Sequence, residues 1–190
     1  MARLGYYGGI DSISAQGDTF YSPMTFPSLI GEDGLEFSLK EHEGKIVMVH
    51  LFSGECNDIC KTNIATINNY LHKTGFKDKW IILSISTDSV ASSLLQDMAE
   101  KDLYPGDNWF YASVHNSESG KQFLENCFIN TGEVSDLDQI SETKTLLFDQ
   151  SLHLRGFFDL KLQDDNKKME DAINVLIQEP HISWKKKKKK

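Results

Sequence analysis

Two cysteines four residues apart carry the clearest chemistry in this sequence. Cys56 and Cys60 enclose Asn57-Asp58-Ile59 and follow closely on the apolar run 45–52. Sulfurs at the start of a helix meet unpaired N–H groups and the positive end of the helix dipole, which favours the thiolate. Two facing thiolates can form a disulfide or bind a soft metal ion such as copper(I) or zinc. The pair is therefore a candidate redox or metal site.

The C-x-x-x-C spacing limits how the two sulfurs can meet. In a continuous helix, residues four apart have Cβ atoms about 5–6 Å apart, whereas a disulfide needs about 3.8 Å. We therefore expect a disulfide to close only if Cys56 precedes the first full helical turn. A soft metal ion accommodates the wider separation. Glu55 and Asp58 oppose thiolate formation and Lys61 partly offsets them, so a hyper-reactive nucleophile is not expected.

The third cysteine is Cys127, and six histidines are further possible ligands. Cys127 stands between Phe123 and Phe128, so we expect it to pack in the core. His115 is the candidate metal ligand among the histidines, because it follows a predicted strand that ends at the same sheet edge as the cysteines. Surface or packing roles are favoured for the others, including His50 within the apolar run.

The elements that would position these residues alternate between strands and helices. Hydrophobic periodicity predicts strands at 35–39, 45–52, 80–86, 109–112, 143–148 and 152–158, and helices at 57–73, 89–101, 118–128 and 165–178. Ser89 is the expected N-cap of the second helix, and Asp149-Gln150-Ser151 the turn of a hairpin. This order predicts an α/β fold with a central mixed sheet that is flanked by helices.

Length and charge predict one domain with tails. Among the 190 residues, we expect an irregular N-terminal arm at 1–24, a domain at 25–179 and a basic disordered tail at 180–190. Six of the 20 basic residues form Lys185 to Lys190, so the remaining chain carries 14 basic against 28 acidic residues. Such an acidic body would repel phosphate backbones, and no nucleic-acid partner is expected. The lysine block is interpreted as a solvated tail or an added tag, with a tether to an anionic membrane as the alternative.

Several segments resemble a known family. At the start of the domain, segments 26–29, 33–39 and 44–49 look like the first segments of thioredoxin-like proteins, which include peroxiredoxins and exported thiol reductases. Within that group, the C-x-x-x-C pair is similar to the Sco/SenC family, the copper chaperones of cytochrome c oxidase assembly. Ser84-Ile85-Ser86-Thr87-Asp88 and the run from Leu147 to Asp159 fit the same pattern. The resemblance covers about residues 25–178.

The resemblance implies a thioredoxin-like fold with an N-terminal hairpin extension. It implies that Cys56 and Cys60 handle copper or electrons during assembly of the oxidase copper centre. It also implies an oxidase subunit or another thiol or copper protein as partner, and an exported location on the periplasmic side of a membrane. Membrane association would need an N-terminal anchor, and the chain as given shows neither a membrane span nor a signal peptide. The alternatives are a thiol–disulfide oxidoreductase without bound metal, and a non-catalytic binding module on the same scaffold.

The chain departs from its relatives at the copper site. The family's copper-binding histidine lies eight residues before the aspartate that ends the next core strand, and counting back from Asp149 gives Ser141. A hydroxyl is a poor copper(I) ligand. The expected metal ligands are therefore Cys56 and Cys60, with His115 as a donor that could replace the missing histidine.

Proline is also missing where related proteins carry it. Asn57 and Lys61 stand where the family has a proline after each cysteine. Thiol reductases of the thioredoxin type carry a cis-proline directly before the strand that corresponds to 143–148, and no proline of this chain lies near it. We therefore expect low activity as a general disulfide reductase.

Overall fold

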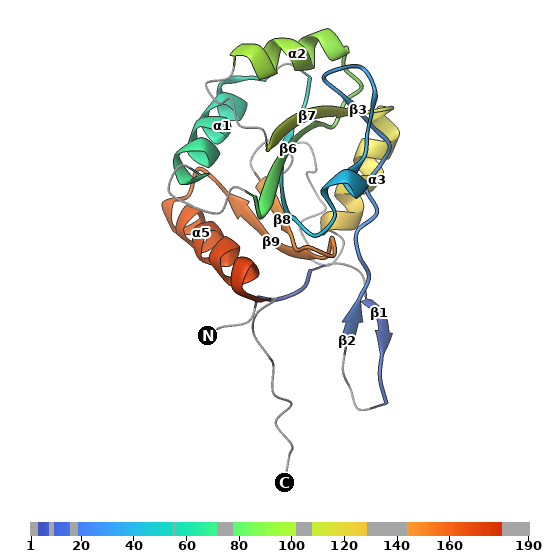
Figure 1. The fold of residues 1–190 in the computed structure, drawn as a ribbon, viewed down its shortest axis with the longest axis vertical. Helices are drawn as coiled ribbons and strands as arrows, with labels where there is room; N and C mark the ends of the chain where they lie inside the picture. Colours follow the sequence, from blue (N-terminus) through green and yellow to red (C-terminus); the bar gives the residue numbers. More distant parts are fainter. Residues whose placement is uncertain are drawn as a thin grey trace.

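The computed structural model describes residues 4–7, 10–15, 19–54, 56–71, 78–101, 108–128 and 144–179. A seven-stranded mixed sheet forms its centre, in the order β4-β3-β7-β6-β5-β8-β9 (Figure 1). Its strands are β3 (Leu29–Gly31), β4 (Glu36–Phe37), β5 (Ile46–Phe52), β6 (Trp80–Ser86), β7 (Trp109–Val114), β8 (Lys144–Phe148) and β9 (Leu154–Asp159). The helices are η1 (Leu39–His42, a 3-10 helix), α1 (Asp58–Leu71), α2 (Ser92–Lys101), α3 (Ser117–Phe128) and α5 (Gln163–Gln178).

The three central strands run parallel to one another, and each outer strand is antiparallel to the strand beside it. β5 and β7 both pair with β6 in parallel, whereas β8 pairs with β5 and β9 in antiparallel fashion. β3 is antiparallel to both β7 and β4. The mixed sheet and the closing hairpin that the sequence predicted are therefore confirmed.

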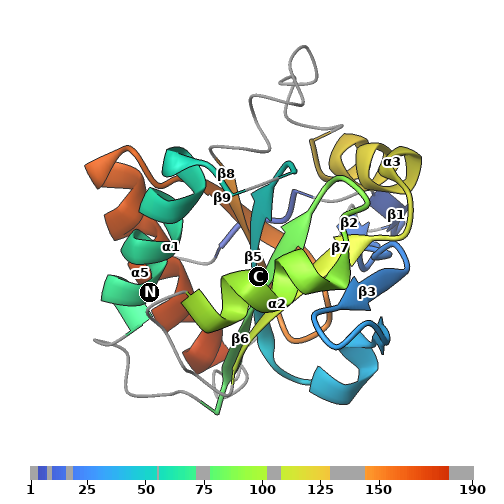
Figure 2. The ribbon, with the colours of Figure 1, turned by 90° about the horizontal axis from the view of Figure 1, so that it is seen from above.

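Helices cover both faces of this sheet. Figures 1 and 2 show α1 and α5 on one side and α3 on the other. Side chains alternate along β5, with Ile46, Met48 and Phe52 packing against α1, α2 and α5. The intervening residues of β5 pack in a second cluster with α3 and the segment around Met24. A strand that is covered on both faces needs apolar residues throughout, which is why its sequence is an almost unbroken apolar run.

Several elements differ from the sequence-based expectation: β1, β2, β3 and η1 were not predicted, and α2 begins later than expected. Residues 1–24 contain an antiparallel hairpin of β1 (Ile10–Ile13) and β2 (Thr19–Tyr21) rather than only irregular chain. α2 begins at Ser92, three residues after the predicted N-cap Ser89. The carbonyl of Ala91 accepts the amide hydrogen bonds of the first turn, from Leu94 and Leu95. The segment before Ala91 does not join the helix, because Asp88 accepts hydrogen bonds from Ser53 and Ser117 in other parts of the chain.

A buried arginine ties three distant parts of the chain together. The Arg155 side chain is almost fully buried, and its guanidinium donates to Asp149 Oδ2 at 2.9 Å and to both carboxylate oxygens of Glu179 at 2.8 Å. It also donates to the carbonyls of Leu4 and Gly5. Because every charged partner is satisfied, this network can persist in a buried position.

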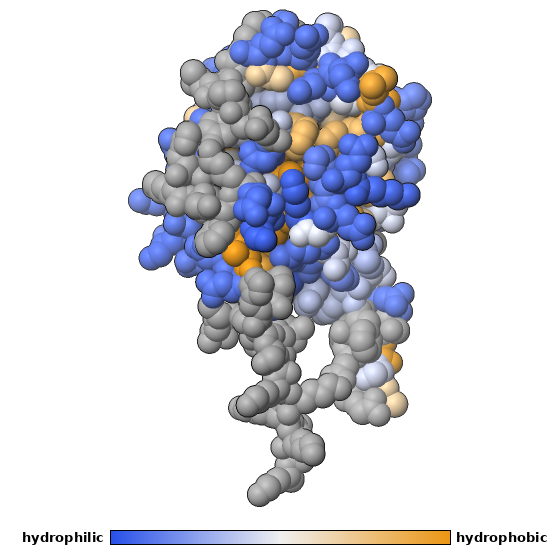
Figure 3. All heavy atoms as spheres, viewed as in Figure 1, coloured by the Kyte–Doolittle hydropathy of each residue, from blue (hydrophilic) through white to orange (hydrophobic). Residues whose placement is uncertain are grey.

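The surface is largely polar. Figure 3 shows hydrophilic side chains over most of the visible face, with apolar residues in narrow areas between them. Within the described residues, no helix combines the length and apolar composition needed to cross a membrane.

Candidate functional site: a disulfide at the start of a helix

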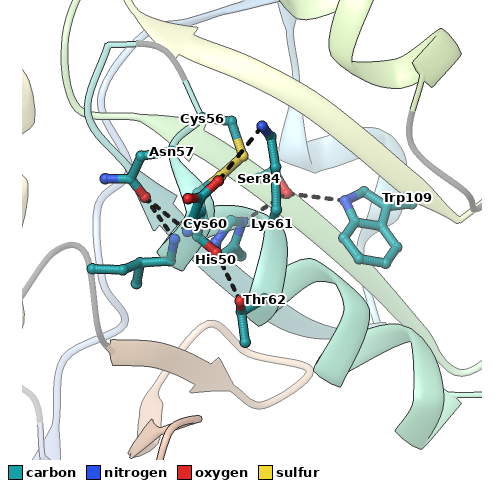
Figure 4. The surroundings of a disulfide bond; sticks show 10 residues. His50, Cys56, Asn57, Cys60, Lys61, Thr62, Ser84 and Trp109 are labelled. Carbon is teal, nitrogen blue, oxygen red and sulfur yellow. Dashed lines mark hydrogen bonds and ion pairs between the residues drawn. A yellow bond between two sulfur atoms is a disulfide. The ribbon is translucent and has the colours of Figure 1, made fainter.

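Cys56 and Cys60 form a disulfide where β5 leads into α1 (Figure 4). The chain leaves β5 at Phe52 and turns at Gly54, whose φ of +57° lies in the left-handed region that glycine adopts without strain. Cys56 therefore stands two residues before α1, and its Cα lies 5.2 Å from that of Cys60. This confirms the condition set by the spacing, because the first cysteine is outside the helix.

Asn57 caps the helix that carries Cys60. Its Oδ1 accepts hydrogen bonds from the amides of Ile59 and Cys60, each at 3.0 Å. These contacts satisfy two of the N–H groups that a helix start leaves unpaired. This cap was not predicted from the sequence, although an asparagine directly before a helix is a signal for one. Asn57 thus fixes the position of the second cysteine.

The loop before the disulfide is held by the neighbouring strand. Ser53 Oγ donates to Asp88 Oδ2 at 2.7 Å, and Ser117 Oγ donates to the other oxygen of Asp88 at 3.3 Å. The amide and the hydroxyl of Thr87 both donate to the carbonyl of Phe52. The end of β6 therefore fixes where β5 ends, and with it the approach to Cys56.

The two sulfurs differ in accessibility. Cys60 is 4% exposed and packs in the core cluster that α1 covers, whereas Cys56 is half-buried at the edge of that cluster. An external thiol can therefore reach Cys56 more easily than Cys60. Lys61 and Asp58 form an exposed ion pair at 3.9 Å beside the disulfide, and a pair of this kind adds little stability.

A polar chain lies on the sheet beneath the disulfide. Trp109 Nε1 donates to Ser84 Oγ at 2.9 Å, and Ser84 Oγ lies 3.2 Å from His50 Nδ1. Figure 4 shows these three side chains among the residues that surround the two cysteines. His50 is 0% exposed, and burial lowers its pKa to about 4, so the imidazole is neutral at pH 7. A surface or packing role was predicted for His50 from the sequence, and this hydrogen-bonded chain was not predicted.

Of the other residues singled out in the sequence, Cys127 lies in the core, His115 follows β7 and Ser141 falls outside the described residues. Cys127 is fully buried among apolar residues, and burial raises the pKa of its thiol, which confirms the core assignment. His115 is exposed after β7. Ser141 falls outside the described residues. Within the described ranges, no three His, Cys, Asp or Glu side chains form a group that could hold a metal ion.

Comparison with known proteins finds likeness in structure only. No protein-family model matches the chain, and no curated protein matches it. Among solved structures, a SCO1/SenC family lipoprotein from Bacillus anthracis has a TM-score of 0.65 at 15% identity, with 82% of this chain and 95% of that chain covered. Copper-bound yeast Sco1 has a TM-score of 0.61 at 17% identity, with 84% and 95% covered. A protein from Bacteroides thetaiotaomicron, described as a putative protein disulfide isomerase, has a TM-score of 0.61 at 16% identity, with 95% and 97% covered.

These likenesses establish the fold. The chain has the thioredoxin-like fold of the Sco/SenC proteins, with a mixed sheet between helical layers, as the sequence predicted. Its C-x-x-x-C pair is closed as a disulfide at the junction of a central strand and the helix that follows.

Proposed function

We propose that this chain is a Sco-like thiol protein that handles copper or electrons through Cys56 and Cys60 in the assembly of the oxidase copper centre. The observation that carries the proposal is the disulfide at the start of α1, in a fold shared with Sco/SenC proteins. An accessible sulfur joined to a buried one suits reversible thiol–disulfide exchange, because a partner thiol can attack the first and release the second.

Copper(I) would be the cargo of the reduced form. Reduction frees two soft sulfur donors, and copper(I) prefers such ligands. Solved relatives of the same fold hold copper, among them yeast Sco1. The partner in this proposal is an oxidase subunit or another thiol or copper protein, and the setting is the exported side of a membrane. Both rest on the likeness to the Sco proteins.

A second candidate is a thiol–disulfide oxidoreductase that binds no metal. Two points support it: the resemblance implies Ser141 in place of the family's histidine, and no three His, Cys, Asp or Glu side chains of the described residues form a metal-binding group. It uses the same two cysteines, so the two functions differ in whether the dithiol form takes up copper.

One experiment separates the two candidates. Reduced protein is titrated with copper(I) against a competing chelator, and the free thiols are counted in the reduced and oxidised forms. We expect one copper(I) per reduced chain, no binding to the oxidised chain and loss of binding in Cys56→Ser. Cys127→Ala is the matched control and should bind as the wild type does, because Cys127 is buried far into the other core cluster.

The outcomes distinguish the alternatives. A reversible disulfide without copper binding would establish metal-free exchange instead. A pair that does not cycle between disulfide and dithiol would contradict both functions. Fast alkylation of Cys127 in the folded protein would contradict its placement in the core.

A further inference from the structure

The polar chain beneath the disulfide ends on an atom without a partner. Trp109, Ser84 and His50 stand on three adjacent strands, and His50 lies directly opposite Ser84 in the register of β5 and β6. Nε2 of His50 is buried and has no hydrogen-bond partner in the described residues. A buried polar atom without a partner costs free energy. Nε2 of His50 is therefore the atom of this chain that is available to a further partner.

The donors and acceptors of Trp109 and Ser84 determine which nitrogen of the neutral His50 ring carries the proton. The indole N–H of Trp109 can only donate, so Ser84 Oγ accepts from it and keeps its own proton to donate to Nδ1 of His50. A chain of donors in one direction is mutually reinforcing. Nδ1 is then the acceptor, and Nε2 carries the hydrogen. The unpartnered atom is accordingly a donor.

His50 faces the helix that carries Cys60. Along β5, His50 lies on the same side as Met48 and Phe52, because alternate residues share a face. Met48 and Phe52 pack in one cluster with Cys60. The rings of His50 and Phe52 lie 6.2 Å apart at the end of the strand nearest the disulfide. In Figure 4 the imidazole lies on the sheet beneath Cys60.

We propose that the Nε2–H group of His50 donates a hydrogen bond to Sγ of Cys60 as the disulfide is reduced. The inference rests on the proposed function, since it concerns how the same pair exchanges electrons. It makes His50 a residue that stabilises the leaving sulfur of the exchange reaction.

The exchange reaction places negative charge on that sulfur. A thiolate of the reductant attacks Sγ of the more accessible Cys56, a new S–S bond forms, and the electron pair of the old bond leaves on Sγ of Cys60. A proton from solvent then converts this sulfur to the thiol. A second thiol of the reductant displaces Cys56 and leaves as the reductant's own disulfide, so two electrons and two protons have reached the protein. A hydrogen bond to the departing sulfur accelerates the first step, because a stabilised thiolate leaves faster.

The test measures the rate at which glutathione reduces the disulfide at fixed pH. In His50→Gln, the amide nitrogen can reach the position of Nε2, whereas in His50→Asn it lies nearer to Nδ1. We expect His50→Gln to react at close to the wild-type rate. His50→Phe and His50→Asn should react about tenfold more slowly, the order of magnitude that one hydrogen bond to a charged group contributes.

A matched control separates hydrogen bonding from packing. Phe52→Leu alters the same face of β5 without a polar group, and we expect its rate to stay within about twofold of the wild type, well below the effect of a hydrogen bond to a charged group. As a direct signature, nitrogen NMR of the His50 ring should show the Nε2 resonance moving on reduction. Retention of the wild-type rate in His50→Phe, an equally slow His50→Gln, or an equally slow Phe52→Leu would each overturn the inference.

The failure of this inference is distinct from failure of the proposed function. A wild-type chain whose cysteines do not form a reversible disulfide would overturn both. A reversible pair whose reduction rate is insensitive to His50 would overturn this inference alone.

Discussion

At the scale of single residues, burial of His50 makes the folded protein sensitive to acid. The neutral imidazole is fully buried, and burial lowers its pKa from 6.5 to about 4. In the unfolded chain the ordinary pKa applies, so between these two values the unfolded state binds a proton that the folded state does not. Stability is therefore complete above pH 6.5 and falls as the pH drops toward 4.

This sign gives a measurable prediction for His50→Phe. Between pH 7 and 4.5 the oxidised wild type should lose about 2–3 kcal/mol more unfolding free energy than the variant, since each unit of pKa difference corresponds to about 1.4 kcal/mol. Urea unfolding of both proteins at the two pH values measures the difference. All other titrating groups are common to the pair, so equal losses in both would contradict the assignment.

The burial of His50 could be predicted from the sequence, but its hydrogen bonds could not. The apolar neighbours of His50 predicted a buried strand, and β5 is one, because a strand that is covered on both faces consists mostly of apolar residues. The chain from Trp109 through Ser84 to His50 joins three strands, and its register exists only once the sheet has formed. The cap Asn57, in contrast, was readable from local sequence.

At the scale of elements, the start of α2 shows why a local signal can fail. Ser89 has the residue type of an N-cap, but the segment before it is engaged elsewhere. Asp88 accepts hydrogen bonds from Ser53 and Ser117, which belong to other elements. These tertiary contacts hold the chain after β6 out of the helix until Ala91. The pairing of β1 with β2 was missed because the segment 1–24 has no alternation of apolar and polar residues.

The contact between α3 and the end of β6 gives an element-scale prediction. A Cβ added at Gly120 would lie 2.5 Å from the carbonyl oxygen of Thr87, which is backbone and cannot turn aside. Gly120→Ala should therefore lower the unfolding free energy by about 1–3 kcal/mol through overpacking, although alanine favours a helix. Gln122→Ala, at an exposed position of the same helix, is the control and should leave stability nearly unchanged. Urea unfolding tests both, and an unchanged Gly120→Ala would contradict this close packing.

Arg155 links β9 to Leu4, Gly5 and Glu179, and the loss of this network should lower the unfolding free energy. In Arg155→Ala, the carboxylates of Asp149 and Glu179 lose their shared cation, and Asp149 is buried. We expect the unfolding free energy to fall by about 3–5 kcal/mol, as for other broken buried ion pairs. The stability of Arg155→Lys should lie between those of Arg155→Ala and the wild type, because lysine keeps the charge but cannot make the bidentate contact with Glu179. Equal stability of all three proteins in urea would show that the network does not hold the fold together.

At the scale of the whole molecule, the topology relates the cysteines to the segment before β8. β8 is antiparallel to β5, with Thr145 opposite His50 and Phe148 opposite Val47. The first residue of β8, Lys144, therefore lies toward the end of the sheet at which β5 leads to Cys56. The resemblance to the Sco family predicts a copper-binding position before this strand, at Ser141, which lies outside the described residues.

Ser141→His tests whether a histidine at this predicted position favours copper handling over metal-free exchange. An imidazole beside two thiolates would complete a three-coordinate copper(I) site, whereas a hydroxyl is a poor ligand. We expect the variant to bind copper(I) at least about tenfold more tightly than the wild type, or about 1.4 kcal/mol, in titration against a chelator. Cys56→Ser should abolish tight binding in either background, since both sulfurs are needed. An unchanged affinity in Ser141→His, together with a loss in His115→Ala, would show that His115 supplies the third donor instead. If neither substitution matters and the reduced wild type takes up no copper, the pair serves thiol–disulfide exchange alone.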